Sequence, residues 1–437
     1  MKRRSFLQNV GKVSAGAAML RCAGDPDVPG TMHGRMVDNA TRAMAEYRKD
    51  TKIAHVRVHQ VHLTKPDYGV PKDHPLAEFR SSSMTGKWST KEHPRGGWGG
   101  PYTGQTGMSI VEVETRDGLR GFGLAGGGLP MQLIAEKHLA QVIKDRNPFD
   151  VLDIWNQMYD VTIRFGRAGI AIMAISGIDL ALWDIAGKAA GVPVSTLLGG
   201  RQRDVIPAYG TGADLAWYVQ QGLQAVKAIW PYAPRDGETG AEGNQAFIRK
   251  VRDLIGLDTD LMTECSMKWD VSYTLAMADQ ARALDLYWIE EALMPHDYDG
   301  YARLCREVDS TRIVSGEHEF AHHGFKVLID RQAADVVQPD IAWTGGLTAM
   351  LHINDLAQSA GLPVFPHSGG TVWALQYMAA AENAPVAETF GVPRKPLSNA
   401  LYELIRPVPI DGKLRVSNRP GFGMDITDAL LDEYRKD

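Results

Sequence analysis

The chain has 437 residues, of which 44% are hydrophobic and 23% are charged, and its formal net charge is −5. This length predicts two domains, and the composition is that of a globular protein with a large core, which excludes a disordered chain. The negative charge, without a Lys/Arg-rich stripe beyond the first residues, predicts no nucleic-acid partner. The cysteines lack the spacing of a metal site or a disulfide framework, so we expect free thiols at Cys22, Cys265 and Cys305.

The N-terminus resembles an export signal. Residues 2–7 read KRRSFL, a twin-arginine pattern, and the small, mildly apolar residues 13–20 follow. Residues 1–30 are therefore predicted to direct the folded protein to the periplasm or out of the cell. The alternative is a basic tail on a cytoplasmic protein, because Lys12 precedes the apolar stretch and no clean cleavage site follows it. No segment approaches 18 consecutive apolar residues, so no membrane span is predicted.

The next segment predicts antiparallel strands around a long connection. Residues 54–58 and 109–114 alternate in polarity, as strands with one buried face do. Residues 66–107 between them are polar and glycine-rich, and their charged and aromatic side chains favour a lid over a disordered loop. Further on, the apolar spacing between residues 149 and 191 predicts a long buried helix.

The rest of the chain predicts a β/α barrel. Eight short β-like runs alternate with helical stretches such as 271–284 and 349–360. The runs cover residues 205–209, 225–229, 261–264, 287–290, 312–317, 336–340, 364–367 and 386–388. Eight such units match a TIM-type barrel better than a doubly wound open sheet, which is the alternative fold.

Six of the last seven runs end in an ionisable residue: Glu264, Glu290, Glu317, Asp340, His367 and Glu388. The intervals between them are 26, 27, 23, 27 and 21 residues, each about one βα unit. A single such residue is better explained as a helix cap or an exposed acid. In a parallel barrel, however, all strand carboxyl ends face one mouth, and active sites of this fold lie there. Six residues in phase therefore predict a functional site.

The residue types predict metal-assisted chemistry. Three neighbouring carboxylates, Glu264, Glu290 and Glu317, would repel one another without a cation, and an all-oxygen ligand set suits Mg²⁺ rather than zinc. Asp340 can hydrogen-bond to His367 and make it a general base, the alternative being a packed structural histidine. The metal would bind a substrate carboxylate and stabilise the enediolate that forms when the neighbouring proton leaves. Glu388 and Lys227 would flank this intermediate.

One long motif carries a family resemblance. Residues 174–188 read AISGIDLALWDIAGK, and PV at 193–194 and LLG at 197–199 follow. This stretch resembles the signature helix of the mandelate racemase and muconate lactonizing branch of the enolase superfamily. Other motifs are most similar to the L-rhamnonate dehydratase group of that branch. They are WIEE at 288–291, GEH at 316–318, QPD at 338–340, GGLT at 345–348, PH at 366–367 and GFG at 421–423.

The resemblance covers residues 52–428 and implies both architecture and reaction. It implies an α+β capping domain, built from residues 52–165 and 396–437, on a (β/α)7-8 barrel over residues 166–395. It implies Mg²⁺ on the three glutamates, the His367–Asp340 pair as base, and loss of a β-hydroxyl from a small-molecule sugar acid to give a 2-keto-3-deoxy acid. Homo-oligomerisation is a further implication.

The chain departs from the family pattern at two site positions. The first metal position is normally Asp followed two residues later by Asn, whereas here it is Glu264 followed by Ser266. Racemases of the branch carry a second lysine two residues after the first, but Ile229 stands there after Lys227. The family is also usually cytoplasmic, whereas this chain has an export-like leader.

Two alternative functions remain open. The first is a racemase or epimerase of a related hydroxy acid, which the missing second lysine disfavours. The second is a non-catalytic, exported sugar-acid binder, which the intact His367–Asp340 pair disfavours. Arg80 and His318 are candidate substrate contacts, because a guanidinium binds planar acids with two hydrogen bonds, although a solvent-exposed arginine is the alternative for Arg80. We expect the lid, His318 and Trp343 to determine substrate specificity.

Overall fold

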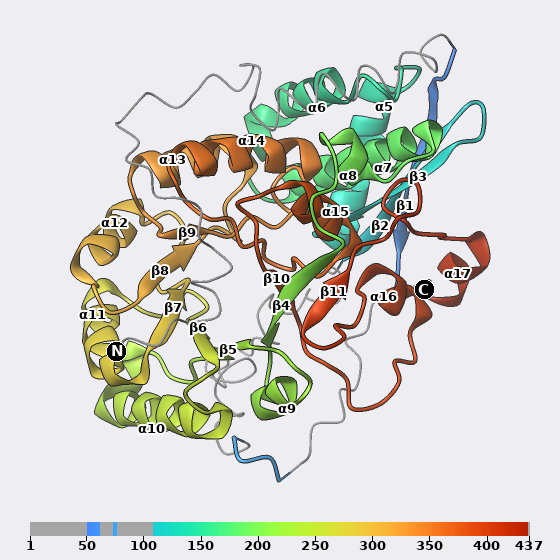
Figure 1. The fold of residues 1–437 in the computed structure, drawn as a ribbon. Helices are drawn as coiled ribbons and strands as arrows, with labels where there is room; N and C mark the ends of the chain where they lie inside the picture. The colour runs from blue at the N-terminus through green and yellow to red at the C-terminus, as the bar shows by residue number, and fades with distance from the viewer. Residues whose placement is uncertain (1–49, 62–72, 77–107, 436–437) are drawn as a thin grey trace, which may run out of the picture.

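The computed structural model describes residues 50–61, 73–76 and 108–435 (Figure 1). The twin-arginine pattern, Cys22, Arg80 and most of the predicted lid lie outside these residues. The two remaining cysteines, Cys265 and Cys305, are free thiols, as predicted.

A three-stranded antiparallel sheet lies near the start of the described chain. Its order is β1 (Ile53–Gln60), β2 (Ser109–Thr115) and β3 (Arg120–Ala125). The first two strands confirm the prediction, whereas β3 was missed because glycines replace its alternating side chains. Those glycines allow β3 to pack closely on α7 (Ile170–Ala190). A Cβ atom on Gly121 would lie 2.0 Å from the carbonyl oxygen of Ala181, and one on Gly123 would lie 2.0 Å from that of Gly177.

The predicted long helix is two helices. Three short helices come first: α4 (Gly128–Leu133), η4 (Ile134–Leu139) and α5 (Ala140–Ile143). Helix α6 (Val151–Gly166) follows, and α7 begins after Gly169, whose φ of +78° separates the two helices. Among the residues that the structure describes, α7 is the one helix long and apolar enough to cross a membrane, and 89% of its apolar window is buried inside the protein. Its apolar character therefore matches a central core helix.

Seven of the eight strands of the second sheet are parallel, in the order β10-β4-β5-β6-β7-β8-β9. They are β4 (Val205–Thr211), β5 (Ala225–Ile229), β6 (Asp260–Glu264), β7 (Leu286–Glu290), β8 (Arg312–Ser315), β9 (Val336–Val337) and β10 (Ala387–Thr389). The remaining predicted run, 364–367, pairs in parallel with the preceding run, through a bridge from Val364 to Val337 of β9 and one from His367 to Asp340 beyond it. On its other side, the N–H of Gly370 donates to the carbonyl oxygen of Glu388 at 2.7 Å. The open sheet is therefore excluded, and the barrel prediction is confirmed.

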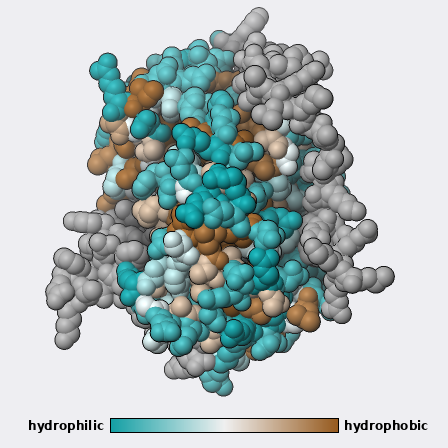
Figure 2. All heavy atoms as spheres, turned by 90° about the vertical axis from the view of Figure 1, so that its left-hand side faces the viewer, coloured by the Kyte–Doolittle hydropathy of each residue, from teal (hydrophilic) through white to brown (hydrophobic). Residues whose placement is uncertain are grey.

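Helices surround the barrel (Figure 1). The helices after α7 are α8 (Val194–Leu197), α9 (Leu215–Gln220), η5 (Pro234–Asp236), α10 (Gly237–Ile255), α11 (Val271–Gln280), η6 (Arg282–Leu284), α12 (Tyr298–Glu307), α13 (Ala321–Asp330), α14 (Gly346–Ser359), α15 (Val372–Ala380), α16 (Ala400–Ile405) and α17 (Asp428–Glu433), the last of which lies away from the barrel. A separate core cluster joins side chains of the parallel strands, with Trp288 in contact with Tyr209 and Phe365. On the face seen in Figure 2, hydrophobic atoms form small groups between hydrophilic side chains.

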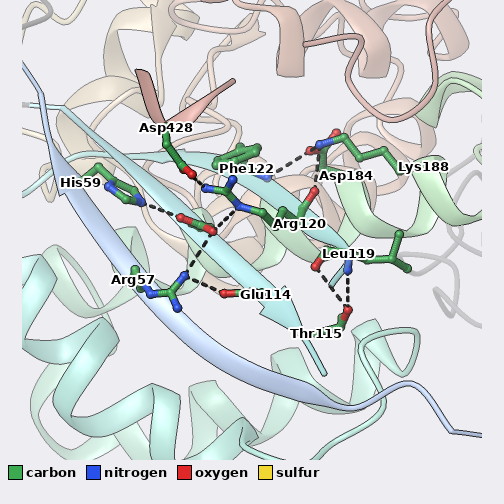
Figure 3. A network of polar contacts seen from close by, with 11 residues as sticks. Arg57, His59, Glu114, Thr115, Leu119, Arg120, Phe122, Asp184, Lys188 and Asp428 are labelled. Atoms are coloured by element: carbon green, nitrogen blue, oxygen red, sulfur yellow. Dashed lines mark hydrogen bonds and ion pairs between the residues drawn. The ribbon is translucent and has the colours of Figure 1, made fainter. Parts of the chain in front are cut away.

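The C-terminal segment returns to the first sheet. Strand β11 (Lys413–Arg415) pairs antiparallel with β4, and α17 reaches β3 through an ion pair between Arg120 and Asp428 at 2.6 Å. The same arginine donates at 2.6 Å to Glu112, a buried residue of β2 that also contacts His59 at 2.7 Å (Figure 3). Both ends of the described chain thus meet in one polar network.

We expect Glu112 to make a pH-dependent contribution to stability. Burial raises the pKa of Glu112, but His59 and Arg120 lower it by more, to about 2. Because the pKa in the folded protein is below the ordinary value of 4.5, ionised Glu112 stabilises the fold fully above pH 4.5. This stabilisation is lost as the pH falls toward about 2. Glu112→Gln should therefore lower the free energy of unfolding by roughly 3 kcal/mol at neutral pH and by less in acid. Urea unfolding at several pH values measures this difference.

Glu114→Gln is the matched control, because Glu114 lies on the same strand but is more exposed. Within this network it contacts Arg57 alone, at 2.7 Å. It should cost less than about 1 kcal/mol. An effect of Glu112→Gln that did not change with pH would contradict the assignment.

Candidate active site

The predicted strand-end residues meet at the carboxyl ends of the parallel strands. Glu264 ends β6, Glu290 ends β7, and Glu317 lies two residues beyond β8. Each of the three can offer an oxygen within 4.8 Å of the others. All three side chains are largely buried, so their charges would be poorly screened and would repel one another unless a cation or protons offset them.

The backbone turns sharply after several of these residues. Ser266, Glu291 and Ser368, which follow Glu264, Glu290 and His367 closely, have φ values of +52°, +42° and +55°. Left-handed backbone at non-glycine residues is costly and is concentrated at functional sites. The turns let consecutive strand ends present side chains to one mouth.

Lys227, on β5, is the buried cation of the site. Its Nζ contacts Glu290 and lies 2.9 Å from Glu388 and 3.7 Å from Glu264. Burial lowers the pKa of Lys227, but Glu290, Glu388 and other neighbours raise it by more, to well above its ordinary value. Lys227 therefore stays protonated and joins the predicted metal ligands to Glu388.

Glu388 is held as an ionised acceptor. It accepts hydrogen bonds from Thr211 Oγ1 at 2.5 Å and from the backbone N–H of Ser368 at 2.9 Å. Burial raises its pKa, whereas Lys227, His367 and Thr211 lower it by more, to about 2. Thr211 was not predicted, because the first β-like run was ended at residue 209, whereas β4 extends to Thr211 itself.

His367 and Asp340 form the predicted pair. Nδ1 of His367 lies 2.7 Å from Asp340 Oδ2, and Nε2 lies 3.7 Å from Glu317. An N–H on Nδ1 donating to the carboxylate leaves Nε2 on the side of the metal ligands. Burial lowers the pKa of His367, but Glu317, Asp340 and Glu388 raise it, to about 10. The rings of Trp343 and Phe390 pack against the imidazole, at 5.2 and 5.7 Å between centroids; Phe390 was not predicted.

His318 also reaches this mouth. Its Nδ1 lies 2.8 Å from Glu291 and 3.5 Å from Glu317. Its ring also packs against Trp343, at 5.6 Å between centroids. The buried Glu291 was missed, because the pattern of strand ends selects one residue per strand. The predicted substrate contact at His318 stays a prediction, as does that at Arg80, which lies outside the described residues.

The carboxylate set suits a hard divalent cation. Burial and the neighbouring Glu290 raise the pKa of Glu264 well above its ordinary value, and burial raises that of Glu317 to about 7 although His367 opposes this. Oε1 of Glu264 accepts from the backbone N–H of Ser266, so the longer side chain folds back while keeping Oε2 toward Lys227. Glutamate at this position is therefore compatible with a shared oxygen site.

Two family models match the chain. The mandelate racemase / muconate lactonizing enzyme N-terminal domain matches residues 102–199, and the enolase C-terminal domain-like family matches residues 212–430. The chain belongs to the mandelate racemase and muconate lactonizing branch of the enolase superfamily.

Individual relatives carry more specific names. An L-rhamnonate dehydratase from Saccharopolyspora erythraea is 38% identical over 326 residues, which cover 73% of this chain and 83% of that protein. The structure of rhamnonate dehydratase from Gibberella zeae complexed with Mg has a TM-score of 0.79 at 30% identity, covering 89% of this chain and 97% of that one. The 3,6-anhydro-D-galactonate cycloisomerase from Zobellia galactanivorans has a TM-score of 0.70 at 28% identity, covering 88% and 100%.

We expect removal of the Lys227 charge to destabilise the metal-free protein. Lys227→Met leaves buried carboxylates without their cation, and breaking a buried pair in this way costs about 3–5 kcal/mol. Lys326→Met is the control, since Lys326 forms an exposed pair with Asp330 at 2.5 Å and should cost less than about 1 kcal/mol. Urea unfolding in EDTA measures both. Equal, small effects would show that Lys227 does not carry the charge balance of the site.

Proposed function

We propose that the protein is a Mg²⁺-dependent hydro-lyase that dehydrates a sugar acid to a 2-keto-3-deoxy acid. The observation that carries the proposal is the His367–Asp340 pair, whose Nε2 lies 3.7 Å from Glu317, one of the three clustered glutamates. The dehydratase names of the relatives and the Mg complex of one of them support it. Small-molecule binding is inherent in this function, and homo-oligomerisation stays a prediction.

The three glutamates would hold Mg²⁺, which when bound neutralises the carboxylate of a substrate and acidifies its α-proton. Nε2 of His367 accepts that proton, and Asp340 keeps Nδ1 protonated and the ring oriented. Among its neighbours, the charge of Glu317 is the largest single cause that raises the pKa of His367. If Glu317 were a metal ligand, its charge would be partly neutralised, and the imidazole would come closer to the neutral form that a base requires. Lys227 and Glu388, which form a buried ion pair, would flank the intermediate.

Elimination completes the reaction. The electron pair of the broken C–H bond forms a C=C bond as the bond from the β-carbon to its hydroxyl breaks. The hydroxyl leaves with the proton that His367 returns to it, so one water is released, and the enol product becomes the 2-keto acid. This sequence needs one proton-transfer group, whereas racemisation requires groups on both faces. Ile229 occupies the position of the second lysine in racemases of the branch, and this favours dehydration.

A substrate panel tests the proposal. Purified protein is supplied with aldonic and uronic-type sugar acids, L-rhamnonate among them, with Mg²⁺ and then with EDTA. We expect 2-keto-3-deoxy product from at least one acid with Mg²⁺ alone. His367→Asn should reduce turnover by about 10³-fold or more, whereas His323→Asn, at an exposed position of α13, should not.

The other outcomes identify the alternatives. Deuterium entering the α-carbon from solvent without water loss would indicate an epimerase. Binding of an acid with neither product nor exchange would indicate a sugar-acid binder. Full turnover by His367→Asn would remove His367 from the mechanism.

We also propose that residues 1–30 export the protein, because they carry the twin-arginine pattern. Cell fractionation should find the natural chain in the periplasm or medium, and Arg3→Lys with Arg4→Lys should retain it in the cytoplasm. An unchanged distribution of the double variant would contradict export by this route.

A further inference from the structure

Helix α14 begins without a cap from its own segment. Its N-cap residue is Gly345, with φ of +112° and no side-chain cap, and Gly346 has φ of +79°. The first N–H groups of a helix have no acceptor within the helix, and buried ones need an acceptor from elsewhere. The start of α14 is buried, so a distant group must supply that acceptor.

Asp179 of α7 supplies it. Its Oδ2 accepts from the backbone N–H of Thr348 at 3.0 Å, and its Oδ1 accepts from Thr348 Oγ1 at 2.5 Å. A Cβ atom on Gly346 would lie 2.4 Å from Asp179 Oδ2. The GGLT motif therefore has a physical reason, because glycine is needed both for the positive φ and for the approach of the carboxylate.

Among the described residues, the Asp179 side chain forms hydrogen bonds only with the start of α14. It is fully buried, and within residues 50–61, 73–76 and 108–435 no ion pair joins it to a basic side chain. Burial raises its pKa to about 7, although the hydrogen bonds from Thr348 oppose this. A carboxyl group kept at such a position stabilises the N-terminus of a helix that it caps.

Two further side chains of α7 form hydrogen bonds with the first residues of α14 and its N-cap. Ser176 Oγ accepts from the N–H of Gly345 at 2.8 Å, and Trp183 Nε1 donates to Thr348 Oγ1 at 3.1 Å. Positions 176, 179 and 183 share one face of the helix, as their spacing requires. The beginning of α14 is thus bound along one stripe of α7.

Residues 340–348 connect the start of α14 to the predicted catalytic pair, His367 and Asp340. The N–H groups of Trp343 and Thr344 donate to the carbonyl oxygen of Asp340 at 3.0 and 2.8 Å. The N–H of Ala342 donates to Asp340 Oδ1 at 2.7 Å, while Oδ2 contacts His367. One end of residues 340–348 therefore orients the carboxylate that holds the imidazole, and the other end is fixed by α7.

We propose that Asp179 is a positioning residue for the His367–Asp340 pair. As the N-cap that α7 supplies to α14, it fixes residues 340–348 and through them the direction of the imidazole Nε2. It touches neither the metal ligands nor Nε2, and it acts through Asp340. The kinetic part of this inference rests on the proposed dehydratase function, whereas its spectroscopic part does not.

Asp179→Asn tests the proposal. The amide keeps the shape and one acceptor, but it removes the negative charge at the start of α14 and reverses or breaks the hydrogen bond with the Thr348 hydroxyl. We expect kcat to fall at least about tenfold with KM changed less than about twofold, since small misplacements of catalytic groups have effects of this size. The downfield proton resonance of His367 Nδ1, bonded to Asp340, should shift or broaden. Both measurements use the full chain with Mg²⁺.

Asp184→Asn is the matched control. Asp184 is a second fully buried acid of α7, but it accepts from the N–H groups of Phe122 and Phe422 at 3.0 and 2.9 Å and pairs with Lys188 (Figure 3). Its substitution should lower the melting temperature while leaving kcat and the resonance unchanged. Thr348→Ser, which keeps the hydroxyl, should retain the wild-type values, and Thr348→Val should lose them as Asp179→Asn does.

A wild-type kcat and resonance in Asp179→Asn would overturn the proposal, as would an equal loss in Asp184→Asn. If Asp179→Asn does not fold, the contrast between Thr348→Ser and Thr348→Val decides in the same way. If the wild-type protein dehydrates no acid, the proposed function fails. The His367 resonance then still decides whether Asp179 orients the pair.

Discussion

The site depends on the repulsion between buried carboxylates. Glu264, Glu290 and Glu317 meet at the mouth of the barrel, and Glu388 lies beside them with Lys227 between. Charges in a low-dielectric interior interact strongly, so this arrangement is stable only with compensating positive charge. One lysine cannot balance four acids. Without a metal, protons offset part of this charge, since the pKa values of Glu264, Glu317 and His367 are all raised. A divalent cation held by the three glutamates would replace those protons.

The position of the site could be predicted because topology imposes it. Every strand of a parallel barrel ends at the same mouth. Ionisable residues that recur once per βα unit can therefore be assigned to one site without knowledge of side-chain contacts. Glu264, Asp340 and His367 were found in this way, and the contact between the latter two confirms their expected proximity.

The partners of these residues could not be predicted in the same way. Thr211, Glu291 and Phe390 act through tertiary contacts that leave no periodic signal in the chain. Strand β3 was missed for a related reason, because its glycines are selected by the close approach of α7 rather than by alternation of polarity. The family motif marked α7 as distinctive, but only the structure shows that its buried acids face two different parts of the fold, Asp179 toward α14 and Asp184 toward β3.

The most direct test of this account is a calorimetric titration of Mg²⁺ into the metal-free protein and into Glu290→Gln. The account predicts one Mg²⁺ bound per chain in the wild type and a large loss of affinity in the variant, because Glu290 would be both a ligand and the partner of Lys227. Absence of binding in the wild type, or equal binding in the variant, would contradict the assignment of the carboxylates as the metal site.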